Sequence, residues 1–153
     1  TLKSNLLHGL GLTQSSVYLS RFAGDRVNKD NELGISVTLL PNFTAAELSS
    51  PQAPLAEMAT DVDLGAFNGK SKLKGIVLLA NKGQSPLEIK MLQVYNPGLS
   101  VSLPKTTLRP GETTEMKIVV STAVDRFRGS RKVLLITNDP RHPKILVNVT
   151  TKK

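Results

Sequence analysis

Short apolar stretches in the C-terminal two thirds of the sequence alternate with a period of two residues. Two segments show this most clearly, with apolar residues on one face at Met116, Ile118 and Val120 in the first and at Ile145, Val147 and Val149 in the second. A helix would need apolar residues at positions i, i+3, i+4 and i+7, and neither segment sustains that spacing. Because a period of two places successive side chains on opposite faces, the pattern predicts β-strands with one buried face.

Seven such runs, separated by turns rich in glycine, proline and asparagine, follow one another from residue 58 onward. They occupy residues 62–64, 74–81, 87–94, 99–103, 114–121, 132–137 and 144–150. Short strands at intervals of about 8–12 residues are typical of a β-sandwich. Tryptophan is absent and aromatic residues make up only 4% of the chain, so we expect a core of leucine, valine and isoleucine. We therefore predict an all-β domain of about seven strands over residues 58–153.

Residues 1–57 have a different pattern. Residues 15–20 and 33–40 are predicted to form two strands joined by a polar loop, and residues 42–54 have the composition of a linker with room for one helical turn at AAELSS. A two-stranded hairpin is at best marginally stable in water. We therefore expect these strands either to dock on the sandwich as an accessory hairpin or to be part of a preceding β-domain.

The stretch NDPRHP, Asn138–Pro143, lies between the last two predicted strands and contains one of the two histidines. His142 and Asp139 are the residue types of a hydrolase base and its orienting acid. Asparagine and aspartate also favour turns, and proline fixes φ, so a hairpin connection explains every residue of the stretch. We predict a turn, and hydrolysis is the least favoured of the functions considered.

No catalytic residue, cofactor or metal site is predicted. The chain has no cysteine, which excludes disulfides, thiolate metal ligands and a cysteine nucleophile. The other histidine, His8, lies far from His142 in the sequence, and two histidines make a poor zinc set. Asp61 and Asp63 flank Val62 at the start of a strand, so we expect Val62 to point inward and both carboxylates to face solvent rather than bind a cation.

Basic residues cluster at two places within a chain of net charge +8. Residues 58–153 carry a net charge of +9, and the clusters consist of Lys70, Lys72 and Lys74 in the first and Arg126, Arg128, Arg131 and Lys132 in the second. The lysines are expected on one face of a solvated edge strand that resists edge-to-edge pairing. The same seven residues are the candidate contacts for a partner or an anion, including a nucleic acid.

Four segments, in order, resemble the motifs of a bacterial immunoglobulin-like family of unknown function that is related to the ASH and major sperm protein domains. They are VDLGAF, LLANKGQSPLEI, LRPGETTEMKIVV and DRFRGSRKVLLITNDPRHPKILVNV, and together they span residues 61–150. Many members carry a C-G-C motif where this chain has YNPG, residues 95–98. The resemblance implies an immunoglobulin-like antiparallel sandwich, tandem domains, no established catalytic residues, and a periplasmic, cell-surface or secreted location.

We therefore expect a non-catalytic interaction or scaffold module of the bacterial cell envelope, with a protein partner. The alternative is a module that binds nucleic acid or another polyanion through the basic C-terminal domain. No run approaches the roughly 20 apolar residues of a membrane-spanning helix. The sequence starts at Thr1, so we expect a processed or partial chain. Composition alone is equally compatible with the cytoplasm.

Overall fold

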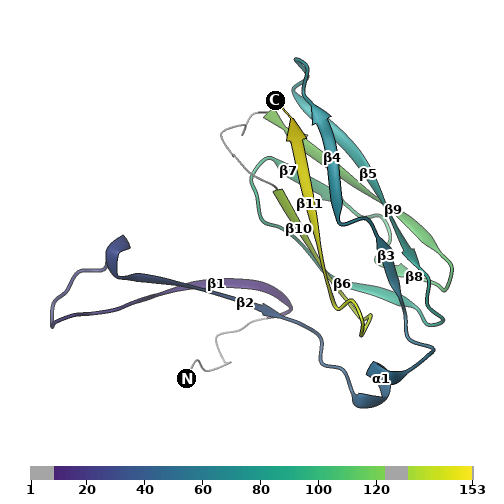
Figure 1. The fold of residues 1–153 in the computed structure, drawn as a ribbon, viewed down its shortest axis with the longest axis horizontal. Coiled ribbons are helices and arrows are strands. Elements are labelled where there is room, and N and C mark those ends of the chain that lie inside the picture. The colour runs from purple at the N-terminus through teal and green to yellow at the C-terminus, as the bar shows by residue number, and fades with distance from the viewer. Residues whose placement is uncertain (1–8, 123–130, 153) are drawn as a thin grey trace.

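Two β-sheets pack face to face in the computed structural model, which describes residues 9–122 and 131–152 (Figure 1). The five-stranded sheet has the order β4-β11-β10-β6-β8 and the four-stranded sheet the order β3-β5-β9-β7. The strands are β3 Ala56–Met58, β4 Asp61–Ala66, β5 Lys72–Asn81, β6 Leu87–Val94, β7 Leu99–Ser102, β8 Thr107–Leu108, β9 Thr113–Ser121, β10 Arg131–Thr137 and β11 Lys144–Lys152. The all-β sandwich predicted from the sequence is confirmed.

The described part of the sandwich has nine strands, against the predicted seven. The additional strands are β3 and β8, which have three and two residues and are too short to show a period. β3 pairs with β5 in one sheet, and the chain then crosses to the other sheet, where β4 runs parallel to β11. The predicted boundary between residues 57 and 58 falls within β3.

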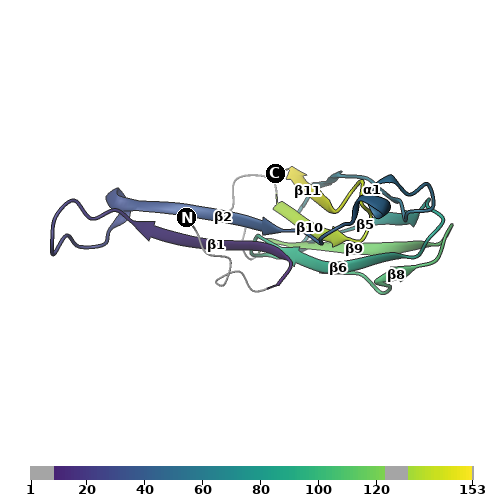
Figure 2. The same ribbon diagram turned by 90° about the horizontal axis from the view of Figure 1, so that it is seen from below.

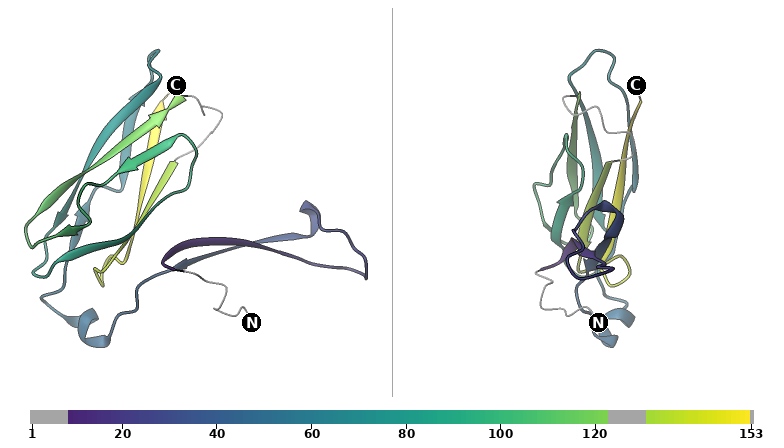
Figure 3. Two further views of the ribbon diagram at one scale, coloured as in Figure 1. Left: turned by 180° about the vertical axis from the view of Figure 1, so that it is seen from behind. Right: turned by 90° about the vertical axis from the view of Figure 1, so that its left-hand side faces the viewer.

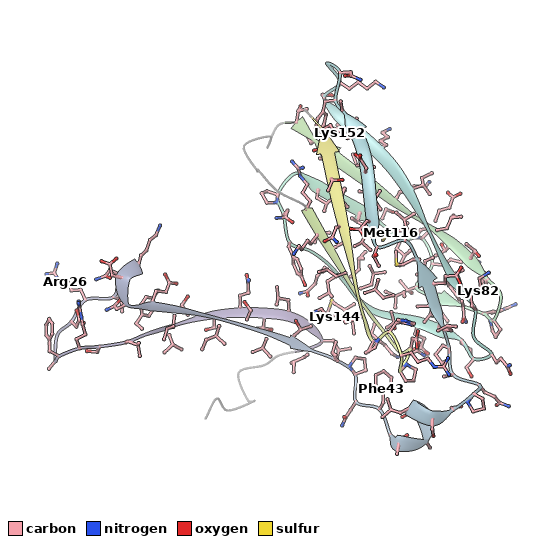
Figure 4. All side chains as sticks on the ribbon, in the orientation of Figure 1. Arg26, Phe43, Lys82, Met116, Lys144 and Lys152 are labelled. Atoms are coloured by element: carbon pink, nitrogen blue, oxygen red, sulfur yellow. The ribbon has the colours of Figure 1, made fainter. Side chains whose placement is uncertain are left out.

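The core lies between the two sheets and consists of the inward-facing residues of alternating strands. Met116, Ile118 and Val120 of β9 are fully buried, as the period of two predicts. Figure 4 shows Met116 within the sandwich. Val62 packs against this cluster from β4, and Asp61 and Asp63 are exposed on either side of it.

Burial does not alternate from residue to residue along β10, because both faces of this strand are buried. Leu134 and Ile136 point away from the core, yet they are as fully buried as Val133 and Leu135. A continuous apolar run, here KVLLIT, is typical of a strand covered on both faces. Each such side chain contributes about 1.5–3 kcal/mol when it is fully buried.

The N-terminal segment forms the predicted hairpin, and its base lies against the outer side of the five-stranded sheet. β1, Gly11–Tyr18, pairs with β2, Glu32–Leu39, and a short 3-10 helix, Lys29–Asn31, precedes β2. β1 contacts β6 and β10, and Gln93 of β6 accepts a 2.7 Å hydrogen bond from the backbone N–H of Leu12. The hairpin therefore docks by its base.

Beyond its base the hairpin projects away from the sandwich (Figures 1 and 2). We call residues 11–39 the arm. The view from behind in Figure 3 shows the arm leaving the lower end of the sandwich, where the linker also passes. The linker contains α1, Ala45–Ser49, which begins with a capping box between Thr44 and Glu47. None of the helices in the described residues is long and apolar enough to cross a membrane.

Replacing Gln93 with alanine is expected to loosen the attachment of β1 while its contacts with β10 remain, so that the sandwich stays folded. The side chain bonds to both the N–H and the C=O of Leu12, at 2.7 and 3.4 Å. Backbone ¹⁵N relaxation should show lower order parameters for β1, with the melting temperature of the sandwich changed by less than about 3 °C. An unchanged β1 would contradict the described anchor.

Candidate interaction surfaces

The stretch Asn138–Pro143 is a bend between β10 and β11, as predicted, but it also holds other segments in place. The Asn138 side chain accepts a 2.7 Å hydrogen bond from the N–H of Glu88 and donates to the carbonyl of Pro86 at 3.1 Å. The Asp139 carboxylate is completely buried and accepts hydrogen bonds from the N–H groups of Ala56 and Arg141. The bend thus joins the end of β10 to β6 and to β3.

His142 and Asp139 are brought together, with His142 Nδ1 2.9 Å from Asp139 Oδ2. The distance is that of the base–acid half of a catalytic triad. The hydroxyl of the same turn, Thr137 Oγ1, is held by two backbone groups, since it accepts from the N–H of Asp139 and donates to the carbonyl of His142. These bonds account for the turn as a structural element.

Asn81 organises a second cluster of hydrogen bonds, at the point where the chain enters the sandwich. Its side-chain oxygen accepts from the N–H groups of Leu55 and Gly83, at 3.3 and 3.0 Å. Its Nδ2 donates to the carbonyls of Ser85 and Leu108, at 2.8 and 3.0 Å. One fully buried side chain therefore holds the linker, the β5–β6 turn and β8 together.

Gly83 lies directly against the linker backbone. A Cβ atom at this position would lie 2.3 Å from the carbonyl oxygen of Ala53 and 2.5 Å from the nitrogen of Leu55. Only glycine permits this approach. Asn81, Gly83 and Pro86 are the asparagine, glycine and proline of the segment LLANKGQSPLEI, so the motif has a structural role that the sequence did not reveal.

Contacts of the Glu112 side chain stabilise the PGE turn, Pro110–Glu112. The Glu112 carboxylate accepts a 2.9 Å hydrogen bond from the N–H of Arg109 and pairs with the ammonium of Lys105. These two contacts, that with Lys105 first, lower the pKa of Glu112 below its usual range. The arrangement fixes the turn that leads into β9.

The predicted lysine cluster lies at the start of β5, with one correction. Lys72 and Lys74 are exposed on the outer face of the strand, whereas Lys70 lies in the turn before it, where its N–H bonds to the carbonyl of Phe67. The ion pairs of the described residues involve none of these three lysines. The predicted edge strand corresponds to only part of β5, because β3 pairs with β5 at Leu79–Asn81 alone.

The predicted arginine cluster is only partly on the surface. Arg131 is 2% exposed at the first position of β10, so it is removed from the candidate contacts. Its neighbour Lys132 is exposed, since successive residues of a strand face opposite sides. Lys132 lies on the outer face of a different sheet from Lys72. Arg126 and Arg128 lie outside the described residues, as does His8.

The two carboxylates of the DVD sequence each have a protein partner. Asp61 Oδ1 accepts a 2.9 Å hydrogen bond from Asn148 Nδ2. Asp63 accepts one from the N–H of Gly65 at 2.8 Å and lies 3.4 Å from Lys152 Nζ. The Gly65 hydrogen bond, more than the Lys152 ammonium, lowers the pKa of Asp63. Within the described ranges no three histidine or acidic residues gather as a metal site would require.

Exposed apolar side chains gather on the arm, which the sequence-based list of candidate residues did not include. Five of them lie at or near its tip and are 44–67% exposed: Tyr18, Leu19, Phe22, Val27 and Leu33. Arg26 marks the same end in Figure 4. Three of them, Tyr18, Leu19 and Leu33, lie in the two N-terminal strands predicted from the sequence. Nothing in the sequence indicated that these side chains are uncovered.

Comparison with known proteins identifies the sandwich. The model of the HYDIN/CFA65/VesB-like, Ig-like domain family matches residues 54–152. A crystal structure of a protein of unknown function from Porphyromonas gingivalis W83 is similar over 96% of this chain and 68% of that chain, with 22% identity and a TM-score of 0.71. No curated protein matches the sequence.

A second solved structure, the Vibrio cholerae VesB protease, is similar over 71% of this chain, with 15% identity and a TM-score of 0.54. This chain spans only 33% of that protein. Because both identities are below 25%, the two structures show a shared fold. The match to the P. gingivalis structure extends well beyond the residues of the family model.

Proposed function

Because the chain belongs to the HYDIN/CFA65/VesB-like family of Ig-like domains, we propose that it is a non-catalytic interaction or scaffold module of the bacterial cell envelope. The observation that carries the proposal is the arm, whose exposed apolar side chains include Phe22 at 63% and Val27 at 67%. Apolar clusters on a projecting element are typical of contact sites for other proteins. The sandwich positions the arm through Gln93 and the buried outer face of β10.

A periplasmic, cell-surface or secreted location forms part of the proposal. It is supported by the motifs shared with a bacterial immunoglobulin-like family, whose relation to ASH and major sperm protein domains also stays a proposal. The partial similarity to VesB does not carry protease activity to this chain, since two thirds of that protein lies outside the match. The pair His142–Asp139 belongs, in this proposal, to the support of the bend.

A photo-crosslinking amino acid at Phe22 tests the proposal in the cells that make the protein. We expect a discrete crosslinked protein species from this position, because the arm is the proposed contact surface. The matched control is the same amino acid at Ser102, an exposed position on β7. Equal yields at the two positions, or none at Phe22, would count against the arm as the contact surface.

Binding of a polyanion is a second candidate, favoured by the exposed and unpaired Lys72 and Lys74. Phosphate or sulfate contacts weaken steeply as salt rises. If this function holds, heparin should retain the protein, and the double variant Lys72→Glu, Lys74→Glu should elute at lower salt. Elution of the native protein at physiological salt would exclude it.

A further inference from the structure

The outer face of the four-stranded sheet has an exposed apolar centre. Val77 and Leu79 of β5 point into the core, so the even-numbered residues of this strand face outward. Two of them, Ile76 and Leu78, are each 57% exposed although they are large aliphatic side chains in mid-strand. The arm contacts the other sheet, and in the view from behind in Figure 3 it does not pass in front of β7 and β9. The described part of the chain therefore leaves this centre uncovered.

Charged side chains of opposite sign flank the apolar centre. The outward residues form four rows across the sheet, which are, in order, Lys74 with Val119, Ile76 with Lys117, Leu78 with Glu115, and Ala80 with Thr113 and Glu57. The first two rows thus contain the lysines and the last two contain the glutamates. All four charged side chains are exposed, and the ion pairs of the described residues include none of them.

We propose that two copies of this chain form a dimer in which the outer face of one copy packs against the same face of the other. The two-fold axis lies between the two faces and across the strands, midway between the row of Ile76 and the row of Leu78. The strands of the two copies then run antiparallel, and Ile76 of each copy packs against Leu78 of the other. Lys117 faces Glu115 of the other copy at two symmetry-related places. Such a contact is isologous, so it closes at two subunits.

The distribution of charge selects a second copy as the occupant and this axis as its position. Lys74 lies over the fourth row of the other copy, where Glu57 is one strand spacing, about 4.8 Å, to the side. An axis along the strands would instead bring the lysines of both copies together, and like charges across an interface disfavour association. An axis through either central row would place Lys117 against Lys117 or Glu115 against Glu115.

Other charged residues near this face lie outside the contact. Lys72 and Lys82 stand beyond the four rows, at opposite ends of β5, where the twist of two packed sheets carries the copies apart. Asp61 and Asp63 of β4 belong to the other sheet, which lies about 10 Å further from the second copy. Asp63 is already paired with Lys152. The four rows therefore bring two residues of each sign from each copy into the contact.

The size of the face indicates a weak dimer. Four rows on three strands cover roughly 400 Å² per copy, given a rise of about 3.4 Å per residue and a strand spacing of about 4.8 Å. Interfaces of this size lie at the low end of the range for specific contacts. An apolar centre with a charged rim is nevertheless the usual composition of a protein interface. We expect a dissociation constant of about 100 µM.

Exchange of charge between Glu115 and Lys117 tests the proposal with the full chain in sedimentation velocity. The native protein should change from monomer to dimer, and to nothing larger, as its concentration rises from about 5 µM to about 1 mM. Lys117→Glu and Glu115→Lys each place like charges at both symmetry-related contacts. Each variant alone should therefore dimerise at least about tenfold more weakly than the native protein.

An equimolar mixture of the two variants should recover dimerisation, because in a heterodimer each contact again joins a lysine to a glutamate. The double variant Glu115→Lys, Lys117→Glu should dimerise like the native protein for the same reason. The matched control is Lys144→Glu, which reverses an exposed charge on β11 in the other sheet and should leave dimerisation unchanged. Thermal melts of all variants establish that the sandwich remains folded.

A native protein that stays monomeric over this range, or one that forms species larger than a dimer, would overturn the proposal. So would single variants that dimerise as strongly as the native protein, or a mixture that does not recover. The face does not include the arm, so crosslinking from Phe22 decides the proposed function separately. Ser102 lies on the face beside Lys117, and a crosslink between two copies from that position is recognised by its mass, twice that of the chain.

Discussion

Asn81→Ala is expected to lower the free energy of unfolding of the sandwich by about 3–5 kcal/mol, or roughly 10 °C in melting temperature. The substitution removes four hydrogen bonds at once, to Leu55, Gly83, Ser85 and Leu108. Asn81 is fully buried, and a buried backbone group left without a partner costs about 1–3 kcal/mol. Water reaches some of the freed groups, which keeps the total below the sum of four full penalties.

Urea denaturation followed by circular dichroism measures the effect, and Asn42→Ala serves as the control. Asn42 is exposed in the linker, and its side chain makes none of the hydrogen bonds found for the described residues. Surface substitutions of this kind change stability by about 0.5 kcal/mol or less. Equal stabilities of the two variants would show that Asn81 does not hold the three segments together.

Gly83→Ala is expected to destabilise the protein by about 3–5 kcal/mol for a different reason, which is overlap with backbone atoms. The added Cβ would lie within 2.6 Å of three atoms of Ala53, Pro54 and Leu55. The linker has to move away, and the bonds from Lys82 and Gln84 to the linker carbonyls are lost with it. β3 should then separate from β5.

Chemical denaturation combined with amide exchange of Ala56 and Met58 checks this result. The matched control is Gly34→Ala, because nothing lies within 4 Å of a Cβ atom at Gly34. Alanine at such a site leaves stability unchanged or raises it by about 0.4–1 kcal/mol. A Gly83→Ala protein as stable as this control would contradict the close approach of the linker.

Strands with a period-two apolar pattern and bends with a strong turn signal could be predicted from the sequence. The alternation in β9 and β11 placed Met116 and Val147 correctly in the core, and the asparagine, aspartate and prolines of Asn138–Pro143 predicted the bend. The capping box of α1 also lies where one helical turn was expected. These features depend on local chemistry, which a sequence contains directly.

Features that depend on distant segments were missed or misplaced. Arg131 belonged by composition to a surface cluster, yet it shares the inner face of β10 with Val133 and Leu135, opposite Val149 of β11, and is buried there. The role of Asn81 requires four groups that lie as many as 27 residues away. The KVLLIT run did contain a usable signal, because its lack of alternation indicated a second covering layer, which the base of the arm supplies.

Amide hydrogen exchange of the purified chain at low micromolar concentration tests the central claim most directly. If the arm is a projecting contact surface anchored only at its base, residues 14–37 should exchange far faster than β9 and β10, whose side chains form the core. Protection of the whole arm equal to that of β10 would contradict the account, since it would mean that the apolar face of the arm is already covered within the chain.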